Sequence, residues 1–306
     1  VIAGLGGSAI GADLLAAYCA AEAKVPVFVH RDYGLPAFAA GRDTLVIASS
    51  HSGNTEETLD AVEVALGRGC TAMAVTTGGL LARRATESKI PLWVFEHGGQ
   101  PRAAIGFSFG LLLALFARLR LIPDPAADMA EAIEAMRRVS ERNGVAVATA
   151  QNAAKRYAGQ LVGRWVTVFG AGLMAPVARR LKTQINEIAK AGANFEFIPE
   201  ADHNALAGIQ NPEGVLMPHT MSLFLRSPSD HPQNRKRLDL TKQAYMLEGL
   251  NADFLDARGR SPLANMWTQI LFGDYLAFYV AMGYGVDPTP VEAIAHFKES
   301  LRTSGP

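Results

Sequence analysis

Short, almost continuously apolar runs alternate with helical patterns along this chain, and the alternation is what most restricts its fold. A strand with one face in water would alternate polar and apolar residues, so these runs fit strands of a parallel sheet that helices cover on both faces. Helices are predicted over Ala9–Ala23 and Thr55–Gly67. The five runs in the first part of the chain are Val1–Leu5, Val25–His30, Thr44–Ser49, Thr71–Thr76 and Pro91–Phe95.

A second series of predicted strands follows a mostly helical stretch between Ala103 and Gly159. Its beginning, Val166–Gly172, resembles Val1–Gly7, because each joins a strand to a glycine-rich turn. We therefore predict an α/β protein with two doubly wound parallel-sheet subdomains, residues 1–120 and 156–306, joined by a helical linker over 121–155. In this second series the predicted strands are Trp165–Phe169, Asn194–Ile198, Ser222–Leu225 and Ala244–Leu247, the helices are Pro176–Ala191, Leu263–Tyr284 and the C-terminal Pro290–Thr303, and Arg226–Asp239 is a loop.

Composition excludes several classes of protein. The formal net charge is zero, which argues against an electrostatic nucleic-acid binder. The longest apolar run, Ala103–Phe116, is too short to span a bilayer and is interpreted as a buried helix. Two well-separated cysteines, Cys19 and Cys70, indicate buried thiols in a reducing compartment, so we expect a cytoplasmic protein. The chain starts on a predicted strand without an initiator Met, and we expect an upstream segment to be missing.

A cluster of hydroxyl groups directly follows the predicted strand Thr44–Ser49. Ser50, Ser52 and Thr55 can each donate a hydrogen bond, and Gly53 lets the backbone approach an oxyanion. The helix that begins near Thr55 adds free N–H groups and a partial positive charge. No Lys follows the glycine, so the nucleotide P-loop is excluded. One hydroxyl here would indicate only a helix N-cap, whereas three around a glycine favour a site for a small phosphorylated ligand.

The first glycine turn, Gly4–Gly11, allows a competing interpretation. It fits Gly-x-Gly-x-x-Ala, a dinucleotide-binding pattern, and Asp32 after the next strand could bind a ribose. An NAD(P)-dependent dehydrogenase therefore stays open. The second hydroxyl cradle weighs against it, because ligands bind at the carboxyl ends of the strands and Ser8 could hold one phosphate together with Ser50–Thr55.

Four charged or titratable residues downstream are candidates for chemistry, and each also has an ordinary structural interpretation. Arg102 precedes an apolar helix, where it could meet an oxyanion or simply extend into solvent. Glu187 could act as a base or be a solvated carboxylate paired with Lys190 one turn away. His203 lies in a polar loop after a strand, where it is either an acid/base or a surface histidine. Lys298 on the last helix is, by base rate, an exposed lysine.

The combined motifs resemble a known family. Ser-x-Ser-Gly-Asn-Thr-x-Glu-Thr after Gly-Gly-Ser resembles the sugar isomerase (SIS) domain, which implies a flavodoxin-like sheet order in both subdomains. Together with Pro101-Arg102, Asn186-Glu187, His203-Asn204 and the C-terminal Asp287-Pro-Thr-Pro-Val and Phe297-Lys298, the chain resembles the bifunctional phosphoglucose/phosphomannose isomerases over nearly its whole length. The SIS loop alone would also suit phosphosugar-sensing regulators and aminotransferring synthases.

This resemblance implies a role for each matching residue. Glu187 would move a proton between C1 and C2 of a hexose phosphate, and Arg102 would stabilise the enediolate. His203 and Lys298 would assist ring opening, with His203 donated by the partner in a homodimer. The variable position His51 receives no role. The substrate phosphate would be bound by Gly7, Ser8, Ser50, Ser52 and Thr55.

The chemistry requires neither a metal nor an organic cofactor, which agrees with the lack of any His, Asp and Glu set at metal-ligand spacing. The leading hypothesis is an aldose–ketose isomerase that interconverts glucose 6-phosphate or mannose 6-phosphate with fructose 6-phosphate. A non-catalytic SIS protein that senses a phosphosugar is the second hypothesis, and the dehydrogenase is the third.

Overall fold

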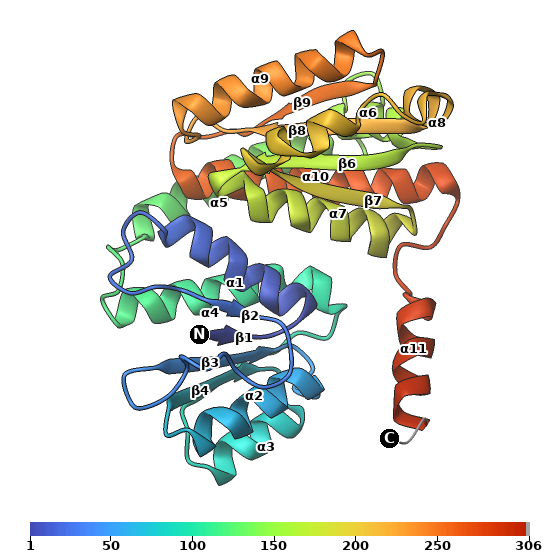
Figure 1. Ribbon diagram of the computed structural model, residues 1–306. Coiled ribbons are helices and arrows are strands. Elements are labelled where there is room, and N and C mark those ends of the chain that lie inside the picture. The colour runs from blue at the N-terminus through green and yellow to red at the C-terminus, as the bar shows by residue number, and fades with distance from the viewer. Residues whose placement is uncertain (304–306) are drawn as a thin grey trace. The chain divides into compact units, whose positions relative to one another are not determined.

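The computed structural model describes residues 1–303, apart from the side chain of Arg302, and forms two compact units divided between Met129 and Ala130. This division lies within the 121–155 segment that was predicted as a helical linker. Two helices, α5 (Ala126–Asn143) and α6 (Ala153–Leu161), fill most of that segment (Figure 1). Because α6 packs against the long helix α10 (Pro262–Tyr284), it belongs structurally to the second unit.

The first unit is a five-stranded parallel sheet with helices on both faces (Figure 1). Its strand order, β2-β1-β3-β4-β5, is the flavodoxin-like order that the sequence implied. Helices α1 and α4 lie on one face, and α2 and α3 lie on the other. The strands are β1 (Ile2–Ala3), β2 (Val29–His30), β3 (Leu45–Ser50), β4 (Thr71–Thr76) and β5 (Leu92–Val94), and the helices are α1 (Gly6–Cys19), α2 (Glu56–Gly67), α3 (Gly79–Glu87), the 3₁₀ turn η1 (Pro101–Ala104) and α4 (Ile105–Arg118).

The core of the first unit explains why its strands are apolar on both sides. In β3 every residue after Leu45 is buried, and in β4 every residue after Thr71 is buried. The predicted buried helix is α4, whose Phe109 and Leu112 are fully buried. Among the described residues, Pro101–Arg118 is the one helical span long and apolar enough to cross a membrane, and half of it is buried within the fold.

The second unit contains a four-stranded parallel sheet with the order β7-β6-β8-β9. Helices α7 and α10 cover one face, and α9 covers the other (Figure 1). The strands are β6 (Trp165–Ala171), β7 (Ala193–Ile198), β8 (Thr220–Arg226) and β9 (Ala252–Asp256). The helical elements beyond α5, α6 and α10 are η2 (Gly172–Met174), α7 (Ala175–Ala189), η3 (Glu200–His203), η4 (Ala205–Gly208), α8 (Glu213–His219), α9 (Pro232–Leu247) and α11 (Glu292–Thr303).

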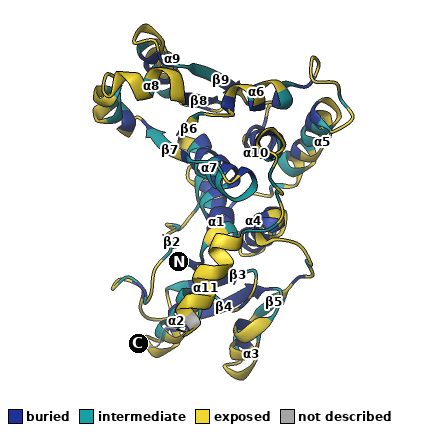
Figure 2. Ribbon diagram, turned by 90° about the vertical axis from the view of Figure 1, so that its right-hand side faces the viewer, coloured by how far each residue is buried: buried dark blue, intermediate teal, exposed yellow. Residues whose placement is uncertain are grey.

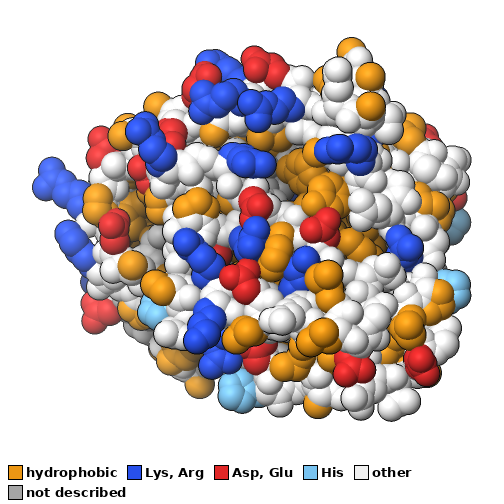
Figure 3. Space-filling model, turned by 90° about the horizontal axis from the view of Figure 1, so that it is seen from above, with side chains coloured by type: hydrophobic (Ala, Val, Ile, Leu, Met, Phe, Trp, Pro, Cys, Tyr) orange, Lys and Arg blue, Asp and Glu red, His pale blue; other side chains and the backbone are white. Residues whose placement is uncertain are grey.

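Aromatic packing holds α9 on this sheet. The rings of Phe169 in β6 and Phe224 in β8 stack with centroids 4.4 Å apart, and Tyr245 of α9 meets both rings edge-on. Edge-to-face and stacked pairs each add to the stabilisation from area burial. On the outer face over α9, basic, acidic and apolar side chains are interspersed (Figure 3).

Two predictions for the second unit were wrong. The run Ala244–Leu247 is the last turn of α9. The fourth strand is β9, which begins eight residues after the start of the predicted strand. Spacing explains the helix, because its buried residues Leu238, Thr241 and Tyr245 recur every three or four positions. The predicted loop Arg226–Asp239 is helical from Pro232 onward, because Pro occupies the first helical position and His231 caps it.

Candidate functional site

Two polar turns meet at the carboxyl ends of neighbouring strands in the first unit. The turn Gly4–Ser8 follows β1, and the loop Ser50–Thr55 follows β3, which pairs with β1 in parallel. The main-chain N–H of His51 donates to Ser8 Oγ at 3.2 Å, so the two turns are joined directly. The structure therefore brings Gly7 and Ser8 together with the second group of predicted phosphate-binding residues.

Hydroxyl groups shape the loop after β3. The hydroxyl oxygens of Ser50 and Thr55 lie 2.9 Å apart, and Ser50 Oγ also accepts the N–H of Gly53 at 3.1 Å. Ser52 Oγ accepts the N–H of Asn54 at 3.2 Å. Thr55 is the N-cap of α2 but makes no side-chain cap bond. The simple N-cap interpretation therefore fails for Thr55, whose hydroxyl faces Ser50 instead of its own helix.

Both turns end at helix N-termini, where main-chain donors are free. Helix α1 begins at Gly6 and α2 begins at Glu56. Within the described chain, the first two main-chain N–H groups of each helix donate no hydrogen bond, as expected of the first turn. Two such ends, each with a partial positive charge, favour an anion between them. Ser8 and Ser50 are buried, whereas Ser52 is exposed and Thr55 is partly exposed.

A third turn, Thr76–Gly79, supports this cradle, and sequence reasoning missed it. Gly53 has φ +66°, and a Cβ on it would lie 1.9 Å from the carbonyl oxygen of Gly78. Leu81 N donates to Gly53 O at 2.8 Å, and Thr77 Oγ1 donates to His51 O at 2.6 Å. Gly53 is thus required by contact with the next turn, and its N–H is already bonded within the loop. The Thr-Thr-Gly-Gly run after β4 was the available signal.

Arg102 lies beside the first turn. It belongs to η1, and a Cβ on Gly7 would be 3.1 Å from Pro101 O and 3.8 Å from the Cα of Arg102. The absence of a side chain at Gly7 therefore lets η1 approach α1. Arg102 is only 8% exposed, which argues against a side chain that extends into solvent.

Glu187 lies on α7 in the second unit and is partly buried. The same helix is fixed to α10 by Arg180 and Gln184, which hydrogen-bond Asp274 at 3.0 and 2.8 Å. Lys190 Nζ donates to the main-chain oxygen of Glu187 at 2.7 Å. This bond to the main-chain carbonyl caps the end of α7.

His203 and Lys298 are both exposed. His203 ends η3, directly after β7, and its neighbour Asp202 anchors the turn through Arg237 at 2.9 Å and Thr241 at 2.6 Å. Lys298 is on α11, which is exposed at every side chain that the structure describes (Figure 2). Lys190 Nζ lies 3.4 Å from Pro288 O, so the segment that leads to α11 passes the end of α7. Among the residues described, no group of His, Cys, Asp and Glu is arranged to hold a metal ion.

Comparisons with known proteins show the family of this chain. A family model for the C-terminal SIS domain of bacterial phospho-glucose isomerase matches residues 150–301. A bifunctional phosphoglucose/phosphomannose isomerase from Caldicellulosiruptor bescii is 39% identical, with 98% of this chain and 88% of the relative covered. The chain belongs to this isomerase family. A second member, from Aquifex aeolicus, is 33% identical over 99% of this chain and 90% of its own length. The family resemblance seen in the motifs is thereby confirmed.

Solved structures support the fold of this phosphoglucose/phosphomannose isomerase family member independently. The tagatose-6-phosphate ketose/aldose isomerase from Escherichia coli superposes with a TM-score of 0.72, covering 94% of this chain and 82% of its own. At 16% identity the likeness concerns the fold alone. The prediction of an α/β protein with two doubly wound parallel sheets is therefore confirmed.

His51, which received no role in the sequence analysis, contacts His97 and Phe95 beside the cradle. Its Nε2 lies 3.0 Å from Nδ1 of His97, and the His51 ring packs edge-on against Phe95. Burial, followed by the neighbouring His97, lowers the pKa of His51. The cradle of this isomerase family member is therefore flanked by an imidazole whose neutral form is favoured.

The second unit has a turn at the corresponding place, but it is not suited to an anion. Ser227 and Ser229 follow β8 as the cradle follows β3, yet both hydroxyls donate to Asn265 Oδ1, at 2.9 and 2.8 Å. Asp230 is buried, and burial raises its pKa to about 6. Its Oδ2 accepts the N–H of Ser227 at 2.7 Å, while its Oδ1 has no partner. A buried carboxylate would repel a phosphate, so the turn after β8 does not form a comparable cradle.

Asp230→Asn is expected to stabilise the protein at neutral pH. Because the folded-state pKa lies above the unfolded value near 3.8, stability is lost as the pH rises from about 4 to about 6 and is constant above. Two pKa units correspond to about 3 kcal/mol, an upper value for the gain in the free energy of unfolding at pH 7.5. Urea unfolding at pH 7.5 and pH 4 measures the difference, with the exposed Asp43→Asn as control. An equal effect of Asp230→Asn at both pH values would contradict the interpretation.

Proposed function

We propose that this protein is an aldose–ketose isomerase that interconverts glucose 6-phosphate and mannose 6-phosphate with fructose 6-phosphate. The observation that carries the proposal is the neutral cradle at the ends of β1 and β3, in a chain 39% identical to a bifunctional phosphoglucose/phosphomannose isomerase. Hydroxyl and main-chain donors at two helix N-termini suit a phosphate monoester. Holding the phosphate rigidly uses binding energy remote from the reaction to position the sugar carbons.

The proposed mechanism assigns the phosphate to Gly7, Ser8, Ser50, Ser52 and Thr55. His203 and Lys298 assist opening of the sugar ring. The Glu187 carboxylate then removes the proton from C2 of the aldose, and electrons move to the carbonyl oxygen to form an enediolate. Arg102 stabilises the negative oxygen, a role that suits a fixed guanidinium. Transfer of the hydroxyl proton from O2 to O1, together with return of the carbon-bound proton to C1, gives the ketose, so no metal or organic cofactor takes part.

The working form is proposed to be a cytoplasmic homodimer in which His203 is contributed across the interface. Support comes from the exposure of His203 on a turn that Asp202 holds in place, because a side chain donated to a partner must project from a rigid support. Two free, buried cysteines, Cys19 and Cys70, agree with a reducing compartment.

A coupled assay with fructose 6-phosphate tests the proposed reaction. The wild-type chain is expected to produce both glucose 6-phosphate and mannose 6-phosphate, each detected with its own coupling enzyme, without added metal or nucleotide. Saturable binding of fructose 6-phosphate without either product would support a phosphosugar sensor instead. Fluorescence titration with NADH and NADPH tests the dehydrogenase alternative. Saturable binding at micromolar cofactor would support a dehydrogenase and contradict the proposed isomerase.

A further inference from the structure

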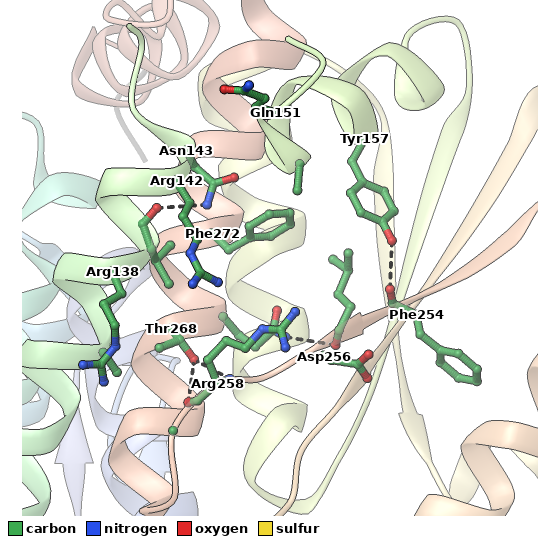
Figure 4. A pocket seen from close by; sticks show the side chains of 16 residues that line it. Arg138, Arg142, Asn143, Gln151, Tyr157, Phe254, Asp256, Arg258, Thr268 and Phe272 are labelled. Atoms are coloured by element: carbon green, nitrogen blue, oxygen red, sulfur yellow. Dashed lines mark hydrogen bonds between the residues drawn. The ribbon is translucent and has the colours of Figure 1, made fainter. Parts of the chain in front are cut away.

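A second concave site is lined wholly by residues of the second unit, whereas the cradle residues belong to the first unit. It is a cavity of about 380 Å³ between α5, α6, the end of β9 and α10 (Figure 4). Its volume lies in the range of pockets that bind small molecules. Glu131 of α5 accepts the N–H groups of Arg260 and Ser261 at 2.7 and 3.0 Å, which ties the β9–α10 connection to α5. The walls are therefore held in place without a ligand.

Two exposed arginines that line this cavity carry positive charge that no carboxylate of the described residues neutralises. Figure 4 shows Arg142 of α5 and Arg258 of the β9–α10 connection extending into the space between these elements. Neither side chain forms an ion pair within the described chain. The one carboxylate in the lining, Asp256, is already bound by Arg226 through two hydrogen bonds, at 2.7 and 3.2 Å. Arg138, also in the lining, is paired with Glu134 at 3.1 Å.

The remaining lining is apolar and aromatic. The rings of Tyr157 and Phe272 meet edge to face with centroids 6.1 Å apart, and Val139 and Leu255 add aliphatic surface. Gln269, which is buried and lines the cavity, donates its amide nitrogen to Leu255 O at 2.9 Å, which leaves its amide oxygen as an acceptor. The cavity thus combines two exposed guanidinium groups, an aromatic wall and a polar acceptor.

We propose that this cavity binds a small organic phosphate that carries a planar ring, of the nucleoside monophosphate class, at a site separate from the isomerase cradle. Two guanidinium groups match a phosphate through paired, charge-assisted hydrogen bonds. Phe272 and Tyr157 offer a face and an edge to a flat ring. The Gln269 amide oxygen can accept from an amino group on that ring. An inorganic anion would leave the aromatic wall unused, and an uncharged ring would leave both arginines unpaired.

Calorimetric titration of the full chain with adenosine 5′-monophosphate tests this site. We expect saturable binding that weakens at least about tenfold in Arg142→Gln and in Arg258→Gln, because each loses a charge-assisted bond. Arg137→Gln removes the same charge from α5 outside the cavity and is expected to bind as the wild type does. Phe272→Leu should weaken the nucleotide more than inorganic phosphate. Adenosine and inorganic phosphate should each bind the wild type at least about tenfold more weakly than the nucleotide.

Ser50→Ala separates this site from the phosphosugar cradle. Nucleotide binding is expected to persist in Ser50→Ala while fructose 6-phosphate binding weakens. The proposal is overturned if the nucleotide shows no binding at millimolar concentration, or if both arginine variants bind it as the wild type does. It is also overturned if Ser50→Ala abolishes nucleotide binding, because the probe then occupies the cradle. Equal affinity of the Ser50→Ala variant for inorganic phosphate and for the nucleotide would exclude the ring-binding role of Phe272 and Tyr157.

Discussion

Glu187→Gln is expected to lower isomerase kcat by about 10²- to 10⁴-fold, the usual contribution of a general base. The amide has nearly the shape of the carboxylate but cannot accept the C2 proton. The proposed phosphate contacts belong to the first unit, so KM for fructose 6-phosphate should change only a few-fold. A loss confined to kcat is the pattern of a group that acts in the transition state.

The Glu187→Gln variant should keep wild-type stability, so a loss of activity could not be attributed to unfolding. Glu187 is only partly buried, and α7 is held to α10 by Arg180, Gln184 and Asp274, none of which is changed. Glu248→Gln, at an exposed position after α9, is the matched control and should keep wild-type kinetics. Steady-state assays in both directions with a melting curve for each variant provide the measurement. Near-normal turnover in Glu187→Gln would remove Glu187 from the role of base.

Most of the fold could be predicted because burial of both sheet faces leaves a clear mark on sequence. Strands such as β3 and β6 are nearly continuous apolar runs, and the glycine-rich turns after β1 and β6 locate their carboxyl ends. Edge strands carry a weaker signal. β9 contains Asp253 and Asp256 and is mostly half-buried, so its sequence, Ala-Asp-Phe-Leu-Asp, does not stand out.

A short apolar run does not by itself show whether a segment is a strand or a helix. Ala244–Leu247 is apolar enough for a strand, but the pattern that decides its structure begins at Leu238, more than one helical turn earlier. A window limited to these four residues could not distinguish the residue spacing of a strand from that of a helix. The Pro at position 232 was taken as a loop signal, whereas at the first position of a helix it is favourable.

Part of the candidate site could be predicted because some of its residues are close together in the sequence. Hydroxyl groups that lie in one short loop, such as those of Ser50 and Thr55, also interact in the fold, so the local motif was sufficient to identify them. The support from Thr76–Gly79 depends on which strand lies beside β3, and that is a property of the sheet order. The roles of Glu187, His203 and Lys298 rest on a match of motifs, and they stay predictions until a variant or a bound substrate tests them.

Gly53→Ala is expected to lower the free energy of unfolding by about 3 kcal/mol or more and to weaken phosphosugar binding at least about tenfold. The added Cβ would lie 1.9 Å from Gly78 O and 2.8 Å from Thr76 Oγ1. The first of these atoms is main chain and cannot rotate away, so the two turns must separate. Their separation breaks the bond from Leu81 N to Gly53 O and displaces Ser50 and Thr55 from their common position.

Gly34→Ala provides the matched control for backbone strain. Gly34 has φ +69°, close to the +66° of Gly53, but a Cβ there would meet no atom within 4 Å. Its substitution should therefore cost only the left-handed strain of an L-residue, about 1–2 kcal/mol, and should leave phosphosugar affinity unchanged. Urea unfolding and calorimetric titration with fructose 6-phosphate compare the two variants. Because their φ angles match, the excess loss in Gly53→Ala measures the contact between the two turns, and equal losses would show that this contact does not hold the cradle together.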